Sequence, residues 1–392
     1  MAACNFVVFG LALLMLWASH EISLPLAAAV IAALLYMERR GVIDALFLLY
    51  VRRKKTAAAS ALFFALTIPL ALATLRYPSH IAVMAVISAM VCCGVNIQMG
   101  SANMVNFAPA AFMGIGAYSL GYVTVKLGAS PWLGLLTALV LCVLAGLLLG
   151  LPTLRTKGYY LSLVTMVLQL AFTQTIKNIP AIGGPNGLSG VKALTLGGYP
   201  LYKTYTFFGM RLAPHFFYLI FCVLALAAAL YAANRIFVTR FGLVLNHIAQ
   251  DEIAANCFGV NVARCKLFAF MTGSVFCGFG GVLYAGLTSF VGPDDFSFSR
   301  SLVFICMVIL GGMDNLAGVA VGAFLLTVIT EKLRGFSDYA QLIYGLLLVV
   351  ILIVRPAGLL PRRVRNYCET FARKLSPPSG SQQPTAAPDT QI

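Results

Sequence analysis

Long apolar runs, set apart by clusters of charge, constrain this sequence more than any other feature. Residues 6–17, 57–75 and 216–233 are three such runs, and they approach or exceed the helix length that crosses a hydrocarbon core about 30 Å thick at about 1.5 Å per residue. The composition agrees, because 60% of the residues are hydrophobic and 10% are charged, against about 45–50% and 25% in soluble domains. We therefore predict an all-α, polytopic helical membrane protein.

About twelve candidate spans alternate with the charged segments. They are residues 4–19, 22–37, 57–75, 80–97, 112–127, 133–151, 159–178, 216–233, 264–288, 301–312, 316–332 and 339–354. The run at 301–312 is too short to cross comfortably, so a re-entrant or broken helix there would lower the count. We predict ten to twelve transmembrane helices.

The distribution of basic residues predicts the orientation of these spans. Lys and Arg outnumber Asp and Glu by 27 to 12, a formal net charge of +15, and in a chain of apolar spans this excess sets topology rather than nucleic-acid binding. Two basic clusters, Arg39–Arg40 and Arg52–Lys55, flank residues 41–51, which we expect to lie along the membrane surface. With that side cytoplasmic, about two thirds of the basic residues lie inside and both termini are cytoplasmic, as the positive-inside rule requires.

The order of these segments predicts three parts. Residues 1–56 form an N-terminal extension with two spans and the basic interfacial segment, and residues 57–361 form the main membrane domain. That domain holds an external loop at 179–215 and a cytoplasmic segment at 234–263. Residues 362–392 form a cytoplasmic tail that is first basic and then rich in Pro, Ser, Gln and Thr, with too few apolar residues to fold.

Motifs for catalysis or for binding a metal or cofactor are missing from the sequence. The four histidines, His20, His80, His215 and His247, are isolated, and no C-x-x-C or H-E-x-x-H motif occurs. No Gly-Lys dipeptide occurs either, so the phosphate-binding Walker loop is absent. We expect no catalytic residue, no metal and no cofactor, and any ATP must be hydrolysed by a partner.

All twelve acidic residues, Asp251, Asp294 and Asp314 among them, fall in loops, tails or span ends under this topology. Proton-coupled carriers commonly keep a carboxylate within the membrane to carry the proton. The placement therefore argues against proton coupling and leaves sodium coupling through backbone carbonyls open.

Uncharged polar residues do occur within the membrane zone. One cluster, Asn96, Gln98, Ser101, Asn103 and Asn106, lies between two predicted spans. Unwound backbone and amide side chains at such a place can form a path for a small polar solute. We therefore predict that the amide residues of this cluster line a solute path.

A second polar set consists of Ser162, Thr165, Gln169 and Thr173. Their spacing of 3, 4 and 4 residues places them on one helical face. This stripe fits either interhelical hydrogen bonding or pore lining, and Gln169 is a candidate residue of the solute path.

The cytoplasmic segment combines charge with small residues. Residues Leu243 to Phe258 are predicted to form one helix, with Gly259 as its stop. Such a helix carries charge on one side and paired alanines on the other, so it can seat in a groove of a partner protein; the alternative is a solvated loop helix. The candidate coupling residues are Arg240, Asp251, Glu252, Ala254, Ala255 and Gly259.

This segment resembles the E-A-A coupling loop of bacterial ATP-binding-cassette importer permeases, in which a cytoplasmic helix docks on the ATPase subunit. Within that class the chain resembles the LivM-type permeases of branched-chain amino acid importers. Further stretches carry the likeness in the same order along the chain: Asn103–Phe107 with Ala111–Tyr118, Leu154–Tyr160, Gly183–Gly190, Met307–Gly312 and Arg355–Leu360. Together they cover roughly residues 80–361.

The resemblance implies the permease subunit of an ATP-driven importer for branched-chain or related small amino acids, in a bacterial plasma (inner) membrane. Its partners would be a homologous second permease, two cytoplasmic ATP-binding-cassette ATPase subunits, an external solute-binding protein, the small-molecule substrate and membrane lipid, with no nucleic acid. The turn at Gly184, Pro185 and Asn186 would contact the binding protein, unless it is only a rigid turn. The alternative function is a secondary carrier or channel that uses the same path without ATP.

The chain departs from the family pattern at a few positions. Ala102–Asn103 and Ala108–Pro109 stand where family members usually have glycines, and Asp314–Asn315 stands where they usually have Gly-Ser. These are suspected path or hinge positions, so the departures bear on the identity of the solute more than on the coupling machinery.

Overall fold

The computed structural model describes residues 10, 13–16, 67–73, 75–153, 160–196, 199–200, 206–207, 210–211, 213–332, 345, 349 and 358–360. All of them belong to the larger of the two units of the chain, residues 1–362. The predicted span at 22–37, most of the predicted span at 339–354, the surface segment at 41–51 and the C-terminal tail lie outside the described residues. The three-part division of the chain therefore stays a prediction.

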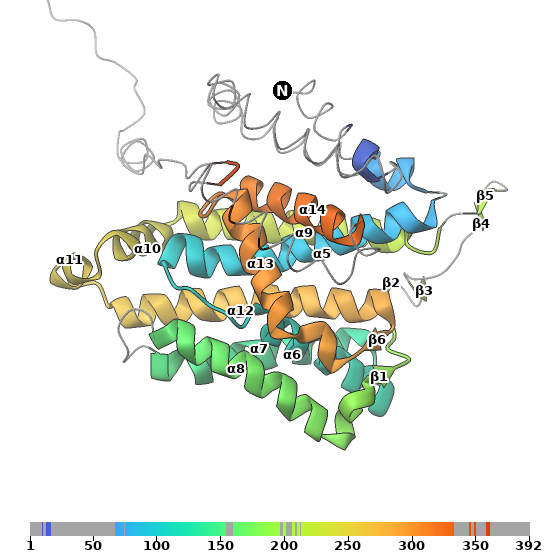
Figure 1. The fold of residues 1–392 in the computed structure, drawn as a ribbon, viewed down its shortest axis with the longest axis horizontal. Coiled ribbons are helices and arrows are strands. Elements are labelled where there is room, and N and C mark those ends of the chain that lie inside the picture. The colour runs from blue at the N-terminus through green and yellow to red at the C-terminus, as the bar shows by residue number, and fades with distance from the viewer. Residues whose placement is uncertain are drawn as a thin grey trace, which may run out of the picture. The chain divides into compact units, whose positions relative to one another are not determined.

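The described part is built mainly of α-helices (Figure 1). They are α5 (Arg76–Asn96), α6 (Pro109–Gly121), α7 (Pro131–Thr153), α8 (Tyr160–Asn178), α9 (Phe216–Val238), α10 (Arg240–Gln250), α11 (Glu252–Cys257), α12 (Val262–Thr288), α13 (Phe298–Gly311) and α14 (Leu316–Lys332). Two π-helical segments, η1 (Ile97–Ser101) and η2 (Tyr122–Lys126), extend α5 and α6. The 3-10 turns are η3 (Pro180–Ile182), η4 (Gly184–Asn186) and η5 (Pro293–Phe296).

Short two-residue strands occur only in the connections of the described part. β1 (Leu188–Ser189) pairs with β6 (Phe290–Val291), β2 (Thr195–Leu196) with β3 (Tyr199–Pro200), and β4 (Thr206–Phe207) with β5 (Met210–Arg211). All three pairs are antiparallel.

Several of the predicted apolar runs lie in helices of membrane-spanning length. Among the described residues four helices are long and apolar enough to cross a bilayer: 76–101, 131–151, 216–238 and 262–288. The run expected to be too short is α13, an apolar helix of 14 residues. The prediction of a polytopic helical membrane protein is confirmed, whereas the total of ten to twelve spans stays a prediction.

α12 is the central helix of the described part, and it packs against α5, α6 and α7. Its glycines allow this close approach, because a Cβ added at Gly281 would overlap the carbonyl group of Met113, and one at Gly278 would overlap Cys142. Small residues serve this purpose in membrane helices, where backbones must come together without a hydrophobic driving force. On the far side of α5, α14 packs against α5 and α13.

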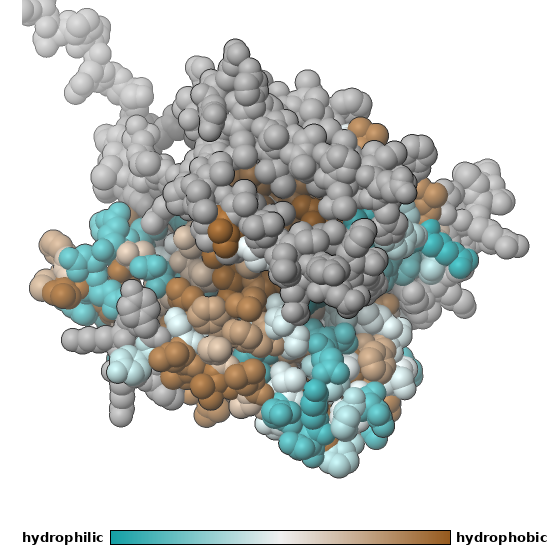
Figure 2. All heavy atoms as spheres, viewed as in Figure 1, coloured by the Kyte–Doolittle hydropathy of each residue, from teal (hydrophilic) through white to brown (hydrophobic). Residues whose placement is uncertain are grey.

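The two ends of α12 carry different connections. At its C-terminal end β6 pairs with β1, and the Nζ of Lys177 lies 2.8 Å from the Oδ1 of Asp294. At its N-terminal end lie α10 and α11. Figure 2 shows a band of hydrophobic side chains between a hydrophilic zone at α10 and α11 and another around the connection that follows α8. The loop that begins at residue 179 and the coupling segment therefore lie at opposite ends of α12.

Candidate functional site

The chain breaks between α5 and α6 into an irregular polar segment. η1 continues α5 in a wider π turn, residues 103–108 are not helical, and α6 begins at Pro109. Asn103 adopts a left-handed φ of 51° and its side chain is exposed. The unwound backbone expected between these two spans is therefore present.

Gln98 and Asn106 hold this break against α12. The Nε2 of Gln98 donates to the carbonyl oxygen of Phe270 at 2.9 Å, and the Nδ2 of Asn106 donates to the Oε1 of Gln98 at 2.7 Å. The Oδ1 of Asn106 accepts from the backbone N of Ala108 at 2.8 Å. Both side chains are fully buried, so in this conformation they bind the protein itself rather than line an open path.

Asn96 and Ser101 hold the other side of η1 against the turn between α13 and α14. The Oγ of Ser101 donates to the Oδ1 of Asp314 at 2.7 Å, and the backbone N of Asp314 donates to the Oδ1 of Asn96 at 2.8 Å. Asp314 is only 2% exposed. It does lie in a turn, as expected of the acidic residues, but it is the one buried carboxylate among the described residues. The departure of Asp314 from the family pattern was a signal in the sequence, but the burial of its side chain could not be predicted.

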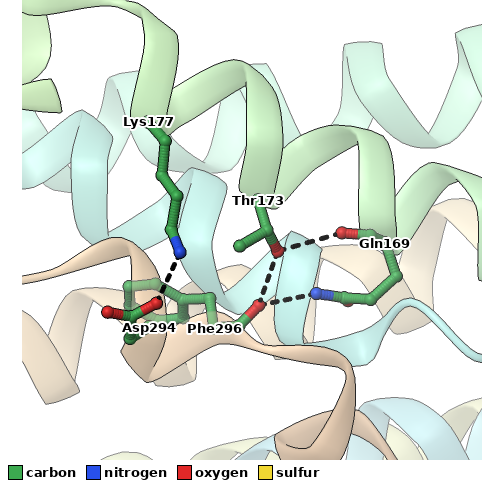
Figure 3. A network of polar contacts seen from close by, with 5 residues as sticks. All are labelled: Gln169, Thr173, Lys177, Asp294 and Phe296. Atoms are coloured by element: carbon green, nitrogen blue, oxygen red, sulfur yellow. Dashed lines mark hydrogen bonds and ion pairs between the residues drawn. The ribbon is translucent and has the colours of Figure 1, made fainter. Parts of the chain in front are cut away.

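The polar stripe on α8 binds the start of α6 and the η5 turn. Figure 3 shows its bonds to Phe296 of η5. The Oε1 of Gln169 accepts from the backbone N of Ala111 at 2.7 Å and from the Oγ of Ser301 at 2.9 Å, and its Nε2 donates to the carbonyl oxygen of Phe296 at 2.6 Å. Thr173 also donates to Phe296, at 3.2 Å. Gln169 is fully buried, so this structure favours the interhelical hydrogen-bonding interpretation of the stripe.

These bonds satisfy the N-terminal amides of α6, which have no partner within the helix. Pro109 has no N–H, Ala110 N donates to the Oγ of Ser301 at 3.1 Å, and Ala111 N donates to Gln169. Just upstream, Phe107 N donates to the Oγ1 of Thr165 at 3.0 Å. The start of α6 is therefore capped by side chains from two other helices.

The coupling segment differs from the single helix that we predicted. It forms two helices, α10 and α11, separated at Asp251, whose backbone is extended. The Oδ1 of Asp251 accepts from the backbone N of Ile253 at 2.8 Å and of Ala254 at 3.1 Å. Asp is a favoured helix cap, and this capping competes with continuation of α10. Gly259, with a φ of 77°, ends the segment as predicted.

α11 is anchored on one side and exposed on the other. Ala255 is buried in a small cluster with Ile248 and Val262, and Glu252 forms an ion pair with Lys266 of α12. Ala254 and Arg240 are exposed. Ala255 therefore packs inside the chain, so the two alanines do not share one exposed surface.

Two large apolar side chains, one on α11 and one directly after it, are exposed and were missed by the sequence reasoning. Ile253 is 77% exposed and Phe258 is 87% exposed, and Figure 2 shows apolar atoms at this outer tip beside hydrophilic neighbours. We call Ile253 and Phe258 the apolar tip. Large apolar residues inside a charged, solvent-facing segment were the available signal, because such exposure often marks a protein contact.

The turn at Gly184–Asn186 is held by left-handed glycines on both sides. Gly183 and Gly187 have φ values of 95° and 70°, and a Cβ on Gly187 would overlap the carbonyl oxygen of Val291. Gly184 is buried, while Pro185 and Asn186 are exposed. The left-handed glycines fix the turn and two of its side chains are exposed, so both interpretations of it stay open.

Comparison with known proteins identifies the family. The model of the branched-chain amino acid transport system permease component matches residues 77–353. The chain belongs to this permease family. No three His, Cys, Asp or Glu side chains of the permease come together as a metal site within the described ranges.

Several relatives of the permease are named transport proteins. It is 34% identical over 282 residues to the high-affinity branched-chain amino acid transport system permease protein LivM of Escherichia coli, a match that covers 68% of the permease and 66% of the relative. The LivM protein of Salmonella typhimurium is 33% identical over 297 residues, with coverage of 72% and 69%. The LivH permease protein of Escherichia coli is 23% identical over 285 residues, with coverage of 70% and 91%. No solved structure matches the permease.

Proposed function

We propose that the chain is a permease subunit of an ATP-driven importer for branched-chain or related small amino acids, with alternating access driven by separate ATPase subunits. Membership of the permease family and the names of the relatives support the class of solute. The main observation in support of an ATP-driven mechanism is the apolar tip, Ile253 and Phe258, which is exposed at a short capped helix near one end of α12.

The apolar tip is suited to dock on an ATPase subunit. Complete burial of a large apolar side chain contributes about 1.5–3 kcal/mol, so the two tip residues together could contribute several kcal/mol. The tip is joined firmly to the membrane part, because Ala255 is packed against Val262 and Glu252 is paired with Lys266. A push or pull on the tip is therefore transmitted to α12 rather than lost in a flexible loop.

The remaining partners follow from the proposed importer. A second, homologous permease is supported by the similarity of this one chain to proteins named LivM and LivH. Pro185 and Asn186, at the end of α12 away from the tip, would contact an external solute-binding protein. The complex would lie in a bacterial inner membrane with both termini of this chain in the cytoplasm.

The solute path would run beside the broken segment between α5 and α6. Asn103 is exposed there, whereas Asn96, Gln98, Asn106 and Gln169 are fully buried in hydrogen-bonded contacts. Their exposure to solute therefore requires a second conformation in which these contacts exchange, as alternating access demands.

Affinity purification of the full chain from native membranes in mild detergent tests this function. The wild-type chain should bring along ATPase subunits and a second permease, and the double variant Ile253→Asp/Phe258→Asp should lose the ATPases while it keeps the permease. Asn256→Asp is the matched control, because Asn256 is exposed on the same helix. Charge reversal at Asp251 would be a poorer test, since it also removes the helix cap. Retention of the ATPases by the double variant would contradict the docking assignment.

A further inference from the structure

The π turn η1 lies between the coupling segment and the turn that joins α13 to α14. We propose that Asp314 is a positioning residue for transport. With Asn96 and Ser101 it forms a clasp between η1 and the α13–α14 turn, so that a movement of α10 displaces η1 and, through the clasp, the α13–α14 turn. This rests on the proposed function, in which α11 meets the ATPase. We call these three residues the clasp.

The clasp brackets η1. Asn96 is the residue before the π turn and Ser101 is its last residue, and both bind Asp314, at 2.8 Å through its backbone N and at 2.7 Å through its Oδ1. Between them, a Cβ on Gly100 would lie 2.5 Å from the backbone N of Asp314. The backbone of the α13–α14 turn is therefore seated directly on η1, so the two segments move together while the clasp holds.

The carboxylate of Asp314 is an unusual group for this turn. It is buried, and its residue adopts a φ of 65°, a left-handed conformation that glycine adopts without strain. A glycine, which the resemblance leads us to expect near this turn, would supply the same backbone without burying charge. Ionisable groups that are buried within a membrane protein commonly serve function.

α10 contacts η1, the segment that the clasp brackets. It packs against both η1 and α12, with Leu245 and Ile248 buried, and the ring of Phe241 contacts that of Phe268 with 4.8 Å between their centroids. Figure 1 shows α10 near the end of α5 from which η1 continues. A displacement of α11 by a partner is therefore delivered by α10 to the π turn.

The C-terminal end of α13, just before the α13–α14 turn, is bound by a segment distant in sequence. The backbone N of Leu359 donates to the carbonyl oxygen of Leu310 at 2.7 Å, and that of Leu360 donates to Gly311 at 3.2 Å. The clasp therefore joins η1 to a turn whose preceding helix end is itself bound to residues 359–360. The amide nitrogen of Asn96 is buried without a hydrogen bond in the described structure, so the closed clasp is not fully satisfied and has a donor available for a second arrangement.

The test uses the assembled importer, purified with its ATPases and second permease and reconstituted with its binding protein. Solute uptake and ATP hydrolysis are measured in the same vesicles. Asp314→Gly removes the carboxylate and accepts the left-handed backbone, and Ser101→Ala removes only the hydroxyl donor. Met313→Ala is the matched control, because Met313 lies in the same turn and is 42% exposed. We expect both clasp variants to assemble and hydrolyse ATP, with solute transported per ATP reduced about fivefold or more, the lower range of allosteric couplings, while the control is unchanged.

A second readout does not depend on ATP. Because coupling between two sites is reciprocal, opening the clasp should speed amide hydrogen exchange in α10, which makes none of the clasp's hydrogen bonds, and a purely local loosening would leave α10 unchanged. A normal transport ratio and unchanged exchange of α10 in Ser101→Ala and Asp314→Gly would overturn the proposal. If Asp314→Gly fails to assemble, Ser101→Ala decides alone. Failure of the wild-type chain to recruit ATPases would instead contradict the proposed function, so the two failures are distinguishable.

Discussion

Replacement of Gln169 by methionine should destabilise the membrane part by about 2–4 kcal/mol. Methionine fills a similar volume but offers no hydrogen bond, so the backbone N of Ala111 loses its partner, which costs about 1–3 kcal/mol for a buried group. Ser301 loses its acceptor, worth about 0.6 kcal/mol on average for a bond between membrane helices. The carbonyl oxygen of Phe296 still accepts from Thr173, so it adds little.

The matched control is Gln174→Met, the same substitution on the exposed face of the same helix. The assay is equilibrium unfolding of the full chain in mixed micelles, with helix content followed by circular dichroism as denaturing detergent is added. Surface substitutions of this kind change the free energy of unfolding by about 0.5 kcal/mol at most. If the Gln169 and Gln174 variants differ by no more than that, Gln169 does not cap α6 in the way the structure shows.

Three further perturbations probe other parts of the chain. Asp251→Ala removes two capping bonds and should cost α11 about 1 kcal/mol, seen as faster amide exchange over residues 252–257 with no change in α12. Burial, reinforced by His80 and Arg76, lowers the pKa of His215, just before α9, from 6.5 to about 4. As the pH falls from 6.5 toward 4, the unfolded chain gains a proton that the folded chain does not, so the free energy of unfolding should fall by up to roughly 3 kcal/mol. His215→Gln should flatten this pH dependence in thermal unfolding. Gly281→Val should destabilise the contact of α12 with α6 by about 1–3 kcal/mol or more, as overpacking does, whereas Ala228→Val on the exposed face of α9 should leave the melting temperature unchanged.

Local sequence patterns were sufficient to predict most of the described helices. The expected run at 133–151 lies within α7, the run at 264–288 lies within α12, and the run at 316–332 coincides with α14. These runs could be predicted because a helix is the way for an apolar run of this length to satisfy its backbone hydrogen bonds in lipid. The positive φ of Gly259 was also predictable, since a glycine after a helical pattern favours a left-handed stop.

The tertiary contacts that form the candidate site could not be predicted from the sequence. Ser101 binds Asp314 across 213 residues, and Gln169 binds Phe296 across 127; no local pattern specifies either pair. The division of the coupling helix at Asp251 was missed for a different reason: the side chain can either extend the helix or cap a new one, and tertiary packing of α10 and α11 on α12 selects the second.

Uptake of a labelled branched-chain amino acid into proteoliposomes tests the central claim most directly. The vesicles would contain this chain with its second permease and ATPases, and the solute-binding protein would be supplied on the external side. The account predicts uptake that requires both ATP and the binding protein and that is lost in Ile253→Asp/Phe258→Asp. Equal, gradient-driven flux through this chain alone, indifferent to ATP, would contradict it and establish the secondary carrier or channel instead.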